Sequence, residues 1–142
     1  MDTHRSVGGC RCTTWSLRVT LPQPSQALRP RVCDCDYCQA HPAGLLSAPD
    51  MAIELQGDRA RLSIEQQGAQ LASFYLCARC GDLLAVGCQL DGALRGACNG
   101  RLLRDWDAFG EPVPISPSSL SPNEKATRWA QLWGPLRIVP NR

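Results

Sequence analysis

Nine cysteines stand in this chain of 142 residues, and seven of them fall into three short clusters. The clusters are Cys10 and Cys12, then Cys33, Cys35 and Cys38, then Cys77 and Cys80. Cysteines at such spacings either form disulfides or bind metal. The number is odd, and the first nine residues contain no apolar segment of a secretory signal. We therefore expect reduced, metal-binding thiols in a cytoplasmic protein.

The cluster C-A-R-C-G at residues 77–81 has the form of a zinc knuckle. Its two thiolates hold one ion, and the glycine lets the chain turn so that backbone N–H groups point at the sulfurs. Such a knuckle needs two further ligands, and Cys10 and Cys12 can supply them. We expect Cys10, Cys12, Cys77 and Cys80 to form a closed structural zinc site that joins the first strand to the middle of the chain.

The central cluster, C-D-C-D-Y-C, is then left with three thiolates, those of Cys33, Cys35 and Cys38. Three protein ligands and an open fourth position are typical of a catalytic zinc. We therefore predict a second zinc on these three residues, with its open position kept for water, hydroxide or a substrate thiol. Two zinc ions per chain follow from this count.

Other residues near the clusters allow two interpretations. Cys88 and Cys98 are favoured as core residues, since free cysteine packs as a small hydrophobe, but either could be a fourth ligand that makes both sites structural. His41 is favoured as a surface or second-shell residue rather than a ligand. Asp34 and Asp36 are favoured as solvated residues, although carboxylates beside a zinc thiolate could act as a general base or bind a substrate amine.

Composition limits the partners. The formal charge is +2 and the chain is 44% hydrophobic and 20% charged, which suits one globular domain. Seven thiolates and two zinc ions would bring the charge near zero, so we expect no nucleic-acid partner. No apolar segment approaches the ~20 residues of a membrane span, so we expect no membrane partner.

The secondary structure is predicted to be mainly β, with a C-terminal helix. The segment T-W-S-L-R-V-T-L, residues 14–21, alternates apolar and polar side chains as a half-buried strand does. Asp91-Gly92 is a hairpin signal between two further strands, at residues 83–90 and 93–99. Additional strands are expected at residues 43–48, 51–55, 60–65 and 71–76. We place one domain at residues 1–142, with its core at about 7–110.

The C-terminal part, residues 111–142, follows a short helix predicted at residues 102–109. Residues 110–119 are rich in proline and serine and are expected to be irregular. Ser121 as N-cap, Pro122 at the first helical position and Glu124 three residues after the cap form a capping box for a second helix. Trp129, Leu132 and Trp133 fall on one face of that helix, which predicts packing against the core.

Three motifs in this order carry a family resemblance: G-G-C-R-C (8–12), C-D-C-D-Y-C (33–38) and F-Y-L-C-A-R-C-G (74–81). Over residues 7–98 the chain resembles the glutathione-dependent formaldehyde-activating family, which includes the relatives of centromere protein V. The resemblance implies a small β-tent fold with two zinc ions. It implies a structural zinc on Cys10, Cys12, Cys77 and Cys80, and a labile active-site zinc on Cys33, Cys35 and Cys38.

The resemblance also implies a function. The family reaction adds glutathione to formaldehyde to give S-hydroxymethylglutathione, so we expect a carbon–sulfur lyase or synthase whose partners are a small thiol and an aldehyde. The alternative is a non-catalytic two-zinc module that binds a protein partner. Three departures from the family pattern, Thr13, Asp36 and Pro42, leave the thiol and the aldehyde open. The sequence does not determine the oligomeric state.

Overall fold

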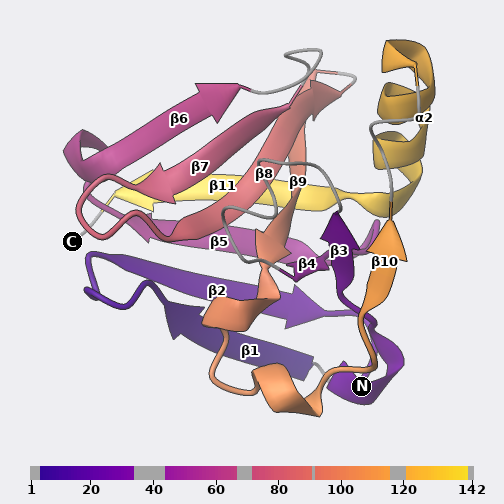
Figure 1. The fold of residues 1–142 in the computed structure, drawn as a ribbon, viewed down its shortest axis with the longest axis horizontal. Helices are drawn as coiled ribbons and strands as arrows, with labels where there is room; N and C mark the ends of the chain where they lie inside the picture. Colours follow the sequence, from indigo (N-terminus) through magenta and orange to yellow (C-terminus); the bar gives the residue numbers. More distant parts are fainter. Residues whose placement is uncertain (1–3, 34–43, 67–71, 91, 116–120, 141–142) are drawn as a thin grey trace.

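The computed structural model describes residues 4–33, 44–66, 72–90, 92–115 and 121–140, drawn as a ribbon in Figure 1. Strands dominate these residues, and a helix follows near the C-terminal end, so the predicted fold class is confirmed. The strands are β1 (His4–Gly9), β2 (Trp15–Leu21), β3 (Arg31–Cys33), β4 (Leu45–Leu46), β5 (Ala52–Gly57), β6 (Leu62–Gln66), β7 (Ser73–Cys77), β8 (Leu83–Leu90), β9 (Ala93–Asn99), β10 (Val113–Ile115) and β11 (Gly134–Pro140). The helix is α2 (Pro122–Leu132), and short 3-10 turns lie at Ser25–Ala27, Arg59–Arg61, Gly100–Leu102 and Trp106–Ala108.

The strands form one branched sheet. Its main path runs β1-β2-β5-β11-β9-β4-β3-β10, and a second branch, β6-β7-β8, joins at β9. Most pairs are antiparallel, as predicted, but β11 with β5 and β10 with β3 are parallel. The two strands of a parallel pair are joined by a long connection. A prediction from local sequence pattern therefore does not show which distant strands pair in parallel.

Strand β11 holds the two parts of the sheet together. Its first residues, Gly134 and Pro135, pair with β9, and the segment from Leu136 to Pro140 pairs with β5. In Figure 1 this strand crosses the molecule between β5 and the branch that contains β8. The sequence analysis did not predict it.

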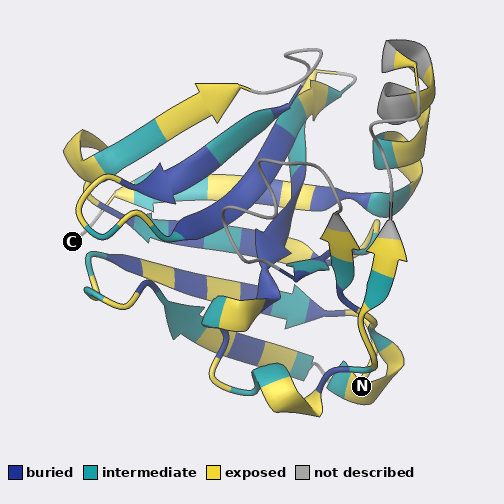
Figure 2. Ribbon diagram, in the orientation of Figure 1, coloured by how far each residue is buried: buried dark blue, intermediate teal, exposed yellow. Residues whose placement is uncertain are grey.

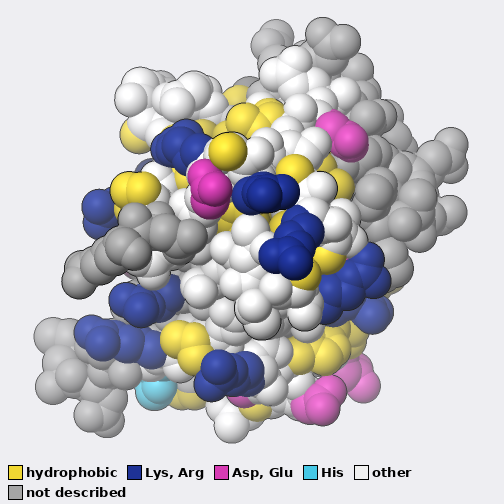
Figure 3. All heavy atoms as spheres, turned by 90° about the vertical axis from the view of Figure 1, so that its left-hand side faces the viewer, with side chains coloured by type: hydrophobic (Ala, Val, Ile, Leu, Met, Phe, Trp, Pro, Cys, Tyr) yellow, Lys and Arg dark blue, Asp and Glu magenta, His cyan; other side chains and the backbone are white. Residues whose placement is uncertain are grey.

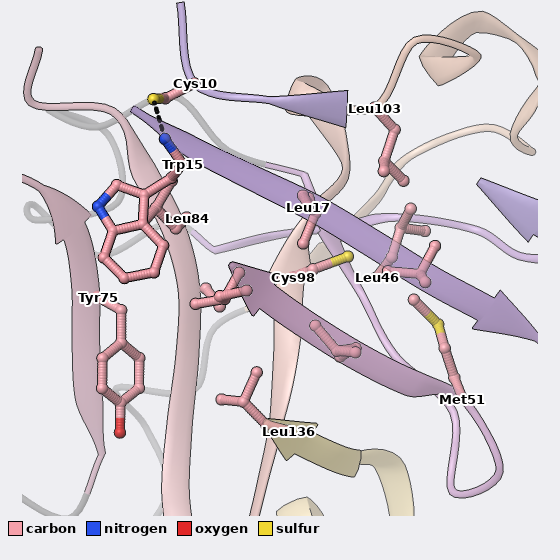
Figure 4. Close-up of a cluster of buried hydrophobic side chains, with 14 of the residues drawn as sticks. Cys10, Trp15, Leu17, Leu46, Met51, Tyr75, Leu84, Cys98, Leu103 and Leu136 are labelled. Carbon is pink, nitrogen blue, oxygen red and sulfur yellow. Dashed lines mark hydrogen bonds between the residues drawn. The ribbon is translucent and has the colours of Figure 1, made fainter. Parts of the chain in front are cut away.

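The core lies between the inner face of β2 and β5 and the strands β7, β8 and β9. Trp15, Leu17, Val19 and Leu21 are all buried while the residues between them are exposed or half-buried, so the alternation predicted for β2 is confirmed (Figure 2). Trp15, Tyr75, Leu84, Cys98 and Met51 belong to one cluster of buried side chains, part of which is shown in Figure 4.

The Trp15 ring also fixes the chain around it. Its indole N–H donates to the carbonyl of Arg61 at 3.0 Å, which links β2 to the turn before β6. A Cβ on Gly57 would lie 2.5 Å from ring atom Cδ2, so only glycine fits opposite the indole. This contact positions the first turn of the chain, residues 10–14, against the middle of the sequence.

The predicted capping box is present at α2. The Ser121 hydroxyl accepts the N–H of Glu124 at 3.2 Å, and the Glu124 carboxylate accepts the N–H of Ser121 at 2.9 Å. Trp129 and Trp133 stack with ring centroids 4.6 Å apart and pack, with Leu132, on the buried cluster of Ala72, Val86 and Ala97. The packing role predicted for this helical face is therefore confirmed.

Two local predictions are wrong. Residues 102–109 form no continuous helix but parts of two 3-10 turns, because Leu103 is buried and bridges to Gly8 across β1. The proline-rich segment is not irregular throughout, since Val113–Ile115 forms β10 against β3. Among the described residues, no helix has the length and apolar character needed to cross a membrane.

Candidate metal centre

Two tight turns bring four cysteines together. The first follows β1: Cys10 ends the strand pairing, the N–H of Thr13 donates to the Cys10 carbonyl at 3.0 Å, and Thr13 takes a positive φ of 65°. The second follows β7: the N–H of Gly81 donates to the Cys77 carbonyl at 2.8 Å, and Gly81 has a φ of 82°. Glycine adopts that conformation at little cost, which is why the knuckle requires it.

The sulfur atoms of Cys10, Cys12, Cys77 and Cys80 all lie within 4.8 Å of one another. The Sγ atoms of Cys10 and Cys12 are 3.6 Å apart, and those of Cys12 and Cys77 are 3.5 Å apart. A tetrahedral zinc with Zn–S bonds of about 2.3 Å has sulfur–sulfur edges of about 3.8 Å. The grouping therefore fits one ion with four thiolate ligands.

Backbone N–H groups point at these sulfurs. The N–H of Trp15 donates to Sγ of Cys10 at 3.3 Å, and the N–H of Cys80 donates to Sγ of Cys77 at 3.5 Å. The Thr14 hydroxyl lies 3.1 Å from Sγ of Cys12. Donors of this kind favour the charged form of a thiol and orient it toward a shared ion.

Three of the four thiols, those of Cys10, Cys12 and Cys80, differ in acidity. Burial raises the pKa of Cys10 to about 12, whereas the hydrogen bond with the Thr14 hydroxyl lowers the pKa of Cys12 to about 6. Burial also raises the pKa of Cys80. Near pH 7 Cys10 and Cys12 therefore do not ionise together on their own, and a bound dication would supply the charge that favours the thiolate form of its ligands.

The turns are also tied to each other outside the sulfurs. The backbone N–H of Arg11 donates to the Asp82 carboxylate at 2.8 Å, and the Arg11 side chain forms an ion pair with the same carboxylate and donates to the carbonyl of Cys80. Exposed ion pairs contribute little energy, so these contacts align the turns more than they stabilise them. Sequence reasoning missed Asp82, although its place directly after C-A-R-C-G was a usable signal.

The structure does not test the predicted catalytic cluster. Cys33 is the last residue of β3, where its backbone pairs with Ile115. Cys35 and Cys38 lie outside the described residues, as do Asp34, Asp36, His41 and Pro42. Gly44, just after this segment, is anchored: its carbonyl accepts the N–H of Gly100 at 2.7 Å, and its missing Cβ would meet the Trp106 ring at 2.3 Å.

Neither remaining cysteine belongs to the four-sulfur group. Cys98 is fully buried in β9 within the main core, and burial raises its pKa to about 12. Cys88 on β8 is half-buried and packs beside the cluster that holds Trp133. These positions agree with the core interpretation of both residues.

A shallow cavity of about 260 Å³ lies on the outer face of β1, β2 and β5. Arg18, Glu54 and Arg104 are among its lining residues, and it contains none of the predicted metal ligands. On the face shown in Figure 3, the described Lys and Arg side chains are scattered among apolar and uncharged ones rather than gathered in one patch.

Comparison with known proteins assigns this chain to a family. The model of the family described as glutathione-dependent formaldehyde-activating enzyme matches residues 5–126. The chain belongs to this family. The match includes all nine cysteines, so the clusters predicted from spacing lie within the family domain.

A solved structure is similar in fold. It is a crystal structure of a Rhodobacter sphaeroides protein from structural genomics, with a TM-score of 0.53 and 21% sequence identity. The alignment covers 77% of this chain and 99% of that protein. Among curated proteins, no sequence matches this chain significantly.

Proposed function

We propose that this protein is a zinc-dependent carbon–sulfur lyase or synthase acting on thiol–aldehyde adducts of the S-hydroxymethylglutathione type. Its family membership supports glutathione and formaldehyde as the substrate classes. The observation that carries the proposal is the completeness of the four-sulfur group. Cys10, Cys12, Cys77 and Cys80 supply four ligands by themselves, so Cys33, Cys35 and Cys38 are not needed to close that site.

In this proposal one site has a structural role and the other binds the substrate thiol. The four-cysteine site suits a structural zinc, because its ligands come from turns far apart in the sequence and leave no free position. A zinc ion on Cys33, Cys35 and Cys38 would lower the pKa of a substrate thiol and hold it as the thiolate. In this proposal the three cysteines are soft ligands that favour a fourth sulfur over an oxygen.

The reaction balances without another reactant. The substrate sulfur forms a bond to the aldehyde carbon, the carbon–oxygen double bond becomes single, and the proton released by the thiol ends on that oxygen. In the reverse direction the carbon–sulfur bond breaks and the free thiol regains its proton. The chain's task is to position the thiol and exclude competing nucleophiles.

The test is catalysis above the spontaneous rate. Exchange between formaldehyde and S-hydroxymethylglutathione can be followed by NMR with the zinc-loaded protein, Cys35→Ser, and Cys88→Ser as a matched control outside all three clusters. We expect acceleration by the wild type and Cys88→Ser and none by Cys35→Ser. Equal exchange with and without the wild-type protein would exclude the lyase and leave the two-zinc binding module as the better hypothesis.

A further inference from the structure

Strand β6 forms a free edge of the sheet. Within the described residues it pairs only with β7, and Figure 1 shows no strand on its far side. In an antiparallel pair, only every second residue exchanges hydrogen bonds with the partner strand. The N–H of Ala78 donates to the carbonyl of Arg61, the residue opposite it, at 2.8 Å. By this alternation the backbone groups of Leu62, Ile64 and Gln66 point away from β7.

The backbone along this edge is available for pairing. The N–H of Leu62 donates to the carbonyl of Arg59 in the preceding 3-10 turn. The carbonyl of Leu62, both backbone groups of Ile64 and the N–H of Gln66 have no partner among the described residues. Unpaired N–H and C=O groups on an edge strand form a template for a further strand.

The apolar inner face of the sheet ends at Ile64. Opposite residues of two paired strands share a face, and Ile64 lies opposite Tyr75, which is buried in the main core. Leu62, on the same face as Ile64, is half-buried and packs against that core. The Ile64 side chain is 56% exposed, more than Val7 or Val32, because no described strand lies beyond β6.

The other two ends of the described sheet are protected. The segment after β9 covers β1, since the N–H of Arg104 donates to the carbonyl of Val7 at 3.0 Å. β10 is three residues long and has Pro114, which has no N–H, at its centre. Covering segments, short strands, prolines and inward-pointing charges are the usual protection of edge strands. β6 has none of these, because its one charged side chain, that of Glu65, lies on the face opposite to Ile64.

We propose that two copies of this chain associate through β6, which pairs antiparallel with β6 of the second copy about a two-fold axis at Ile64. The two Ile64 residues then lie opposite each other with Cα atoms about 5.5 Å apart, and their backbones exchange hydrogen bonds. The N–H of Gln66 donates to the free carbonyl of Leu62 of the second copy. Ser63 lies opposite Glu65, so no like charges face each other. The edge is therefore complementary to itself, as a two-fold interface requires.

The test is the mass of the zinc-loaded chain in solution, measured by sedimentation from micromolar to millimolar concentration with a reductant present. We expect the average mass to rise from 15.5 kDa toward twice that value, because so small an interface gives a weak dimer. Ile64→Glu sets two carboxylates opposite each other and should raise the dissociation constant by about 10-fold or more. Val7→Glu, on the covered edge and opposite Arg18, is the matched control and should leave the dimer unchanged.

Further variants test the backbone pairing and its register. Ile64→Pro removes an N–H that β7 does not use, so we expect a folded monomer, with the fold checked by circular dichroism. If that variant does not fold, Ile64→Glu still decides. Ser63→Arg would face Glu65 of the second copy and should tighten the dimer several-fold, whereas Ser63→Glu should weaken it.

Three results would overturn the dimer. A wild-type chain that stays at 15.5 kDa at every concentration excludes it and leaves the edge to an extended segment of a different protein. A dimer that Ile64→Glu and Ile64→Pro leave intact uses another surface. A dimer on which Ser63→Arg and Ser63→Glu act alike has another register. Sedimentation does not depend on the proposed reaction, so the lyase can fail while the dimer stands.

Discussion

Sγ of Cys12 lies 3.5 Å from Sγ of Cys77, although 65 residues separate them in the chain. The contact joins the turn after β1 to the turn after β7, and no strand pairing links those two strands directly. A metal held between these turns would close a long loop of the chain. Bringing the two ends of such a loop together costs conformational entropy, which the bound metal would offset. The stability of the fold should therefore depend on this site.

The metal content is the first measurable consequence. We expect about two zinc ions per chain in protein purified without a chelator, one on each cysteine site. Elemental analysis against protein concentration measures this. A value of one that falls to zero in Cys77→Ser would identify the second zinc as easily lost, whereas zero zinc with disulfides among the seven clustered cysteines would contradict both sites.

The two sites should differ in their effect on folding. Cys77→Ser removes a ligand of the four-sulfur group, and a structural zinc contributes folding free energy on the order of 10 kcal/mol, comparable to the ~5–15 kcal/mol stability of a whole domain. We expect Cys77→Ser to unfold and Cys35→Ser to stay folded, as measured by circular dichroism and thermal melting. Equal destabilisation would show that the central cluster also has a structural role.

Thiol binding at the central cluster can be seen directly. In the cobalt-substituted protein, a thiol arriving at Cys33, Cys35 and Cys38 should strengthen the sulfur-to-metal charge-transfer band, because a fourth soft ligand is added. The variant Cys35→Ser should show no such change with glutathione. If the wild-type spectrum stays constant with several thiols, the open position does not exist.

The buried thiol of Cys98 should make stability fall at high pH. Its pKa in the fold is about 12, while an unfolded thiol ionises at about pH 8.5. Between these values the unfolded state has lost a proton that the folded state keeps, so stability decreases by about 1.4 kcal/mol per pH unit. Below pH 8.5 the effect vanishes. Urea unfolding of wild type and Cys98→Ala at pH 8, 9 and 10 should show a steeper decline for the wild type; parallel declines would contradict it.

Gly57→Ala tests the packing that positions the first turn. The added methyl group would lie 2.5 Å from Cδ2 of Trp15, and such overpacking costs about 1–3 kcal/mol. Gly81→Ala is a useful comparison, because nothing lies within 4 Å of its Cβ and its cost arises from the positive φ alone. Urea unfolding measures both. An unchanged midpoint for Gly57→Ala would mean that the indole moves freely.

Local signals predicted much of this fold. The alternation around Leu17, the turn at Gly92 and the cap at Ser121 each depend on neighbours within a few residues, and all three are confirmed. The grouping of Cys10 with Cys77 was also predictable, because zinc chemistry restricts how many cysteines one site takes.

The missed elements depend on distant partners. β11, G-P-L-R-I-V-P, contains two prolines and no alternation clear enough to predict a strand, and it exists because β5 and β9 leave room between them. β10 is likewise formed by its parallel partner β3.

The place of β11 in the sheet also sets an order of events during synthesis on the ribosome. All nine cysteines precede Gly134, the first residue of β11, so every thiol has emerged before the strand that joins β5 to β9. A nascent chain can thus gather metal at Cys10, Cys12, Cys77 and Cys80 while the edges of β5 and β9 are still open. Metal binding at these four cysteines would then precede the pairing of β11 with β5 and β9, which would be the last step of folding during translation.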